Sequence, residues 1–136
     1  LNKKNIQHSL EHMKAVDHEV WFKIDHVNPK EALKINRVNL SIASLRKNLQ
    51  SAISISPTIV QTCLLKINKK LPSDDFVNEY IKFLDPYASQ LKAIHLYSMV
   101  RPSQQKTDLQ IDALDKSELQ IIADKMNVLK TKIECY

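Results

Sequence analysis

The apolar positions along this chain change their spacing repeatedly, and each change marks a predicted element. Apolar residues three and four positions apart are typical of amphipathic helices, which we predict over 6–16, 39–56, 73–85 and 115–129. Short runs rich in branched and aromatic residues favour strands, which we predict over 19–25, 58–67 and 91–100. The closing residues 132–136 fit either a fourth strand or a frayed end. The pattern therefore predicts helices and strands in strict alternation.

Capping residues support the starts of three predicted helices. Asn39 or Ser41 can cap the helix that follows it, and Ser73 can cap the next one. Asp115 and Glu118 form a capping-box pattern at the start of the last helix. Leu114 and Leu119 occupy the hydrophobic staple positions around that box.

Alternation of strands and helices predicts the fold class. A connection that contains a helix is too long for a hairpin, so neighbouring strands are expected to run parallel with right-handed crossovers. We therefore expect an α/β fold of alternating helices and parallel strands, with about three to four strands in a sheet or part of a barrel. The 136 residues are enough for one domain, so residues 1–136 are interpreted as a single domain.

Composition narrows the classes of function. Hydrophobic residues make up 43% and charged residues 26%, as in globular proteins. The absence of glycine excludes a glycine-rich phosphate loop within this chain, and its turns must use Asn, Asp, Ser and Pro. The sequence contains neither a signal peptide nor an apolar run that could span a membrane, so no membrane partner is expected. The first residue, Leu1, is not Met, which favours a piece of a longer protein.

Net charge, histidine spacing and cysteine number give three further expectations. The net charge is +5, but the lysines are scattered and form no basic stripe with interleaved aromatics, so no nucleic-acid partner is expected. His8 and His12 are four residues apart without a third ligand, so no metal site is predicted. Two cysteines, Cys63 and Cys135, form no disulfide framework, and we expect a cytoplasmic protein.

The predicted strands carry polar residues on one of their two faces. Successive side chains of a strand point to opposite faces, and helices should cover the apolar one. The second face then holds Lys23, Asp25, Gln61, His95, Tyr97 and Arg101. These residues form a ligand wall, because parallel α/β folds bind ligands at the carboxyl ends of strands, or they are solvated strand ends with a Lys23–Asp25 or Asp25–Arg101 ion pair. No complete catalytic apparatus accompanies them.

Several segments together resemble one enzyme family. VWFKID, PTIVQTCL, YIKFLDP and IHLYSMVRPS, in this order, are similar to the C-terminal half of a radical SAM (S-adenosylmethionine) enzyme. The resemblance covers roughly residues 6–130. It implies a partial (β/α)6 barrel of the TIM type, of which this chain supplies the last half. The second face of the strands would then line the barrel lumen.

The resemblance also implies cofactors and binding residues. In such enzymes a [4Fe–4S] cluster binds SAM and generates a 5′-deoxyadenosyl radical, which abstracts a substrate hydrogen. Lys23 and Asp25 match the strand position that contacts SAM, and Gln61 and Tyr97 would border the adenosyl or substrate region. Arg101 could hold an anionic substrate or the SAM carboxylate, since guanidinium groups bind carboxylates bidentately. The resemblance assigns no catalytic residue.

This chain departs from the family in its missing N-terminal half. The cluster motif CxxxCxxC and the glycine-glycine-glutamate motif are absent, and Cys63 and Cys135 cannot replace three closely spaced thiolates. The chain alone is therefore expected to be inactive. It is either the C-terminal portion of a radical SAM enzyme or a non-catalytic half-barrel used for binding or assembly. Exposed strand edges lead us to expect a homo-oligomer.

Overall fold

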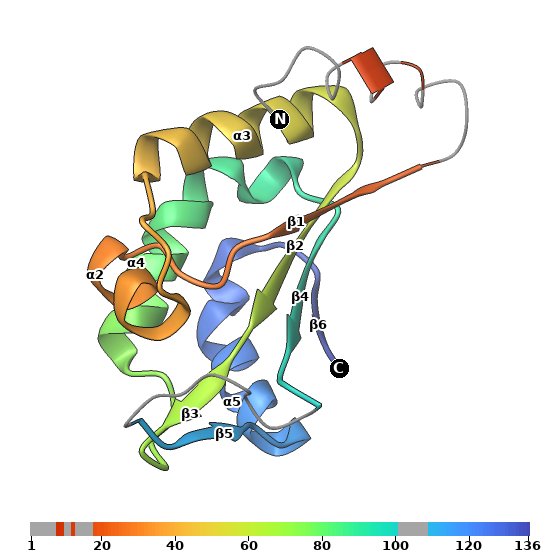
Figure 1. Ribbon diagram of the computed structural model, residues 1–136. Coiled ribbons are helices and arrows are strands. Elements are labelled where there is room, and N and C mark those ends of the chain that lie inside the picture. The colour runs from red at the N-terminus through yellow and green to blue at the C-terminus, as the bar shows by residue number, and fades with distance from the viewer. Residues whose placement is uncertain (1–7, 10–11, 13–17, 101–108) are drawn as a thin grey trace.

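The centre of the fold is a four-stranded parallel sheet (Figure 1). A computed structural model describes residues 8, 9, 12, 18–100 and 109–136. The sheet has the order β1-β2-β4-β6, with bounds Val20–Lys23, Thr58–Cys63, Ala93–Tyr97 and Ile133–Cys135. Each neighbouring pair runs parallel. The predicted α/β class is confirmed, and residues 133–135 form the fourth strand rather than a frayed end.

Three helices connect the successive strands of this sheet. They are α3 (Ile42–Ile55), α4 (Asp74–Leu84) and α5 (Lys116–Met126). A short helix α2 (Pro29–Glu31) continues into a π-helical segment (Ala32–Asn36), and 3₁₀ turns at Asp85–Gln90 and Asn127–Leu129 extend α4 and α5. The strands follow one another in chain order, so right-handed crossovers place the connecting helices on one face. Figure 1 shows α3, α4 and α5 on the same side of the sheet.

The helices begin where the capping residues predict. Ser41 rather than Asn39 caps α3 by accepting a hydrogen bond from the Ser44 amide. Ser73 caps α4, and Asp115 and Glu118 form the complete capping box of α5. Caps of this kind stabilise a helix by about 1 kcal/mol each. Because these bonds are local, they can be predicted from short sequence segments.

The predicted strand 58–67 is wrong as a single element. It breaks after Cys63, and β3 (Leu65–Ile67) leaves the parallel sheet to pair antiparallel with β5 (Ile111–Ala113). The Ser98 hydroxyl donates to the Leu64 carbonyl at 2.6 Å and accepts from the Leu114 amide at 2.8 Å. The Ser98 side chain therefore links the residue before β3 to the residue after β5. The predicted helix 6–16 falls largely outside the described residues.

The core lies between the sheet and the helices. Val60 of β2, Ile94 of β4 and Ile24, which directly follows β1, are buried in one cluster with helix residues such as Leu49, Tyr80 and Leu119. Burial of a large apolar side chain contributes about 1.5–3 kcal/mol, so this layer supplies most of the stabilising free energy. None of the helices in the described part of the chain is long and apolar enough to cross a membrane.

The chain makes its tight turns without glycine. Asn68 (φ 51°) and Lys69 (φ 63°) are both left-handed and form a two-residue turn between Ile67 and Lys70. Two left-handed central residues define a type I′ turn. Asn tolerates this conformation, as predicted for the turns, whereas a lysine with a β-carbon is strained in it.

Replacing Lys69 with glycine should stabilise the protein. The Lys69→Gly change removes the β-carbon clash, and after the entropic cost of glycine it should raise the free energy of unfolding by about 0.5–1 kcal/mol. Urea denaturation measures this change. Lys70→Gly is the matched control, because Lys70 does not have a positive φ and should gain nothing. Equal effects of the two changes would contradict strain at Lys69.

Candidate functional site

The face of the sheet opposite the helices is organised in layers by the strand register. Trp21, Ile59 and Ala93 lie side by side near the start of the strands. The next layer contains Lys23, Gln61, His95 and Glu134. Cys63 and Tyr97 lie side by side at the carboxyl end, and alternation places Asp25 on the same face. Of the predicted second face, Lys23, Asp25, Gln61, His95 and Tyr97 therefore share one side of the sheet, and Arg101 lies outside the described residues.

Lys23 joins two of the other predicted site residues. Its ammonium nitrogen lies 3.4 Å from Asp25 Oδ2 and 5.9 Å from the centre of the Tyr97 ring. Partial burial acts to lower the pKa of Lys23, but its hydrogen bond with Tyr97 and the charge of Asp25 outweigh this and raise that pKa. The Lys23 side chain is 59% exposed, so a ligand can reach it. The ammonium stays charged at neutral pH.

Asp25 is held by the backbone of the neighbouring strand. Its Oδ1 accepts a hydrogen bond from the Cys63 amide at 3.0 Å, and its side chain is only 16% exposed. The carboxylate is therefore held in place at the carboxyl ends of β1 and β2. The alternative interpretation of the polar face includes a Lys23–Asp25 ion pair, and this pair is present. Arg101 and its alternative pairing with Asp25 lie outside the described residues.

The sequence only partly predicts a contact between a histidine and a carboxylate on the same face. His95 Nε2 lies 2.8 Å from Glu134 Oε2, and Lys132 Nζ lies 2.8 Å from Glu134 Oε1. The hydrogen bond from Lys132 lowers the pKa of Glu134, and His95 adds to this effect. The sequence places His95 on this face, but Glu134 belongs to the segment for which strand and frayed end stayed open. Only the β4–β6 register brings the two side chains together.

An exposed tryptophan at the amino end of the face is hydrogen-bonded to a neighbouring carboxylate. Trp21 is 57% exposed, and its indole nitrogen donates to Glu19 Oε1 at 2.6 Å. Glu19 in turn accepts from Lys92 at 2.6 Å. The neighbouring Ile59 and Ala93 are buried but do not belong to the core on the helix side. The amino end of this face is therefore apolar, whereas its carboxyl end carries the polar residues.

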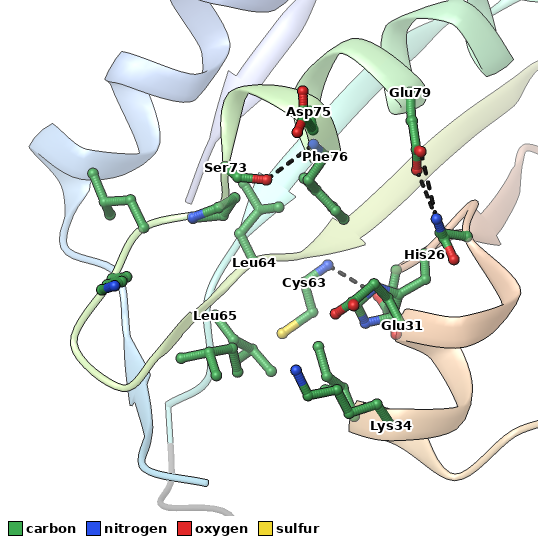
Figure 2. Close-up of a pocket in the computed structure, with 17 residues that line it drawn as sticks. His26, Glu31, Lys34, Cys63, Leu64, Leu65, Ser73, Asp75, Phe76 and Glu79 are labelled. Carbon is green, nitrogen blue, oxygen red and sulfur yellow. Dashed lines mark hydrogen bonds between the residues drawn. The ribbon is translucent and has the colours of Figure 1, made fainter.

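A cavity of about 360 Å³ opens beside the carboxyl ends of β1 and β2 (Figure 2). One wall is polar and comes mainly from the segment after β1, with Asp25, His26, Glu31 and Lys34. The other wall is apolar and includes Leu64, Leu65, Leu71 and Phe76. Of the residues that the sequence assigned to cofactor binding, the described part of the chain contributes only Asp25 to this cavity. Sequence patterns missed it because two loops and a helix start enclose it.

The cavity walls are connected to each other and to the sheet. Asn28 Nδ2 donates to both carboxylate oxygens of Glu79 on α4, at 3.1 and 3.4 Å.

Burial lowers the pKa of His26, so its imidazole is neutral at neutral pH, and its Nδ1 is buried without a hydrogen-bond partner among the described residues. Burial also raises the pKa of the Cys63 thiol, with a further contribution from Asp25. Cys63 is therefore a poor nucleophile at neutral pH.

In the part of the chain that the structure describes, no group of three or more His, Cys, Asp or Glu side chains could hold a metal ion. No protein-family model, no curated protein and no solved structure matches this chain.

Asp25 should stabilise the fold through its backbone hydrogen bond more than through its charge. Asp25→Asn keeps an oxygen that can accept from the Cys63 amide and should change the free energy of unfolding by no more than about 0.5 kcal/mol. Asp25→Ala leaves that amide unpaired and should cost about 1–2 kcal/mol. Urea denaturation of both variants measures the difference. Equal losses would mean that the exposed ion pair dominates.

Proposed function

We propose that this chain is the C-terminal portion of a radical SAM enzyme and lines the SAM and substrate side of its barrel. The observation that carries the proposal is the shared face of Lys23, Asp25, Gln61 and Tyr97, opposite the helices of a sequentially ordered parallel sheet. A sheet whose strands follow chain order and whose helices share one face has the topology of a barrel section. The polar face corresponds to the lumen of such a barrel.

The residue types on this face suit SAM. The Asp25 carboxylate can accept hydrogen bonds from ribose hydroxyls, and the Lys23 ammonium can bind the SAM carboxylate. Tyr97 offers an aromatic surface for adenine, and the Gln61 amide offers both donors and acceptors. Arg101 remains assigned to a substrate anion or the SAM carboxylate by the resemblance alone. SAM would supply the radical precursor, while these residues bind and orient it.

The residues of this chain do not fit a [4Fe–4S] cluster. Cys63 and Cys135 are the two cysteines, and adjacent register positions place them on opposite faces of the sheet. A cluster needs several thiolates around one point. The cluster ligands in this proposal therefore belong to a preceding part of the parent enzyme, and this chain alone is inactive. Two free thiols suit the reducing cytoplasm that we propose as its location.

SAM affinity of the longest native gene product tests this proposal. After anaerobic cluster reconstitution the product should be brown and should bind SAM. Gln61→Ala should weaken SAM binding about tenfold, as expected for a lost hydrogen bond to a charged or polar ligand. Gln50→Ala is the matched control, because Gln50 is exposed on α3 on the helix side. A colourless product, or equal SAM affinity of both variants, would count against the proposal.

A second candidate function is a non-catalytic half-barrel that serves as a binding or assembly module. Two observations favour it. In the described part of the chain, the outer edges of β1 and β6 have no strand partner. Trp21 and Tyr136 are also 57% and 67% exposed, and exposed aromatic residues are common in protein interfaces. Such edges pair readily with another chain, so this function implies a homo-oligomer through the sheet edges.

Sedimentation velocity over a range of concentrations tests the assembly module. A concentration-dependent dimer or larger species is expected, and Trp21→Lys should weaken it because it removes the exposed indole from the β1 edge. Val128→Lys is the matched control, since Val128 is similarly exposed at the end of α5. A protein that stays monomeric at every concentration would contradict assembly through the sheet edges.

A further inference from the structure

The cavity beside β1 and β2 has a charge opposite to that of the chain. The chain as a whole carries a net charge of +5. The cavity, by contrast, is lined by four carboxylates and two ammonium groups: Asp25, Glu31, Asp75 and Glu79, and Lys34 and Lys70. Burial lowers the pKa of His26, so this residue adds no positive charge at neutral pH. The local charge therefore favours a cationic ligand.

Not all of this negative charge is compensated within the protein. Asp25 has the Lys23 ammonium at 3.4 Å, whereas the hydrogen-bond partner of Glu79 among the described residues is the neutral amide of Asn28. Glu31 and Asp75 have no ion-pair partner within 4 Å in the described part of the chain. A ligand with N–H donors would match these carboxylates.

The opposite wall and the volume limit the rest of the ligand. Leu64, Leu65, Leu71 and Phe76 present an apolar surface that suits an aliphatic or aromatic body. The volume of about 360 Å³ is near the lower end of the range for small-molecule sites, so one small molecule fits. Figure 2 shows the polar side chains His26, Glu31 and Lys34 on one side and Leu65 on the other. A ligand lying between them needs a polar end and an apolar end, and the excess of carboxylates over ammonium groups in the lining favours a positive charge on the polar end.

We propose that this cavity binds a small organic ammonium ion, with its cationic group at the Glu31 side and its apolar body against Leu65 and Phe76. This inference rests on the proposed function only in naming a class of substrate for that enzyme. The binding itself requires neither SAM nor a cluster. Asp25 lies between the cavity and the polar sheet face, so a molecule bound here would be next to the proposed SAM site.

Amide NMR with matched probes tests the site. Phenethylamine, 2-phenylethanol and 3-phenylpropionate share a phenyl body and differ in charge. Phenethylamine should shift the amide signals of Leu65 and Phe76 and bind about tenfold more tightly than the alcohol, while the anion should not bind. Equal affinity of the amine and the alcohol, or shifts located elsewhere, would overturn the proposal. So would the absence of any shift at millimolar amine.

Charge removal at the cavity supplies the second test. Glu31→Gln should weaken phenethylamine binding by about threefold to tenfold, because it removes one carboxylate without changing the shape of the side chain. Asp85→Asn is the matched control, since Asp85 is exposed beyond the end of α4 and does not line the cavity. Equal weakening by both variants would overturn the assigned site.

The result of the amine-binding test can be distinguished from the result of the SAM-binding test. SAM binding to the native enzyme is measured through Gln61 on the polar sheet face, whereas amine binding is measured through Leu65 and Phe76. Amine binding without SAM binding would leave this inference standing and reject the radical SAM proposal. SAM binding without amine binding would support the radical SAM proposal and reject this inference.

Discussion

The handedness of the crossovers between parallel strands is the constraint on which the rest of this structure depends. β1, β2, β4 and β6 lie in chain order, and each pair of neighbours is parallel. Crossovers between parallel strands are almost always right-handed, so α3, α4 and α5 are expected on the same face, and Figure 1 shows them there. The hydrophobic core forms between that face and the helices. The described helices of these connections do not cover the other face, and the polar residues of that face are available to a ligand or a partner.

Asp25 shows how the stabilising and binding interpretations of the polar face coexist. Its charge pairs with the exposed Lys23, which contributes little to stability because water screens such pairs. Its hydrogen bond to the Cys63 amide contributes more, since that amide has no substitute partner if the carboxylate is lost. The same bond orients the carboxylate toward a place where a ligand can meet it. Structural and binding roles therefore do not exclude each other here.

The sequence predicted local and periodic features well and distant contacts poorly. Ser41, Ser73 and Asp115 cap helices as expected, because a cap depends on only four neighbouring residues. The shared face of Lys23, Gln61 and Tyr97 followed from strand alternation. The break at Leu64 could not be predicted, since it depends on a Ser98 hydroxyl 34 residues away. The cavity and the His95–Glu134 pair likewise depend on register and loop packing, which have no short sequence pattern.

We propose that this polar face belongs to a radical SAM enzyme whose cluster-binding part precedes it. The most direct measurement is mass spectrometry of the native protein, with peptide mapping of the region before Leu1. We predict a longer polypeptide in which a CxxxCxxC segment precedes this chain. A native protein that begins at or within a few residues of Leu1 would contradict the claim and favour the assembly module.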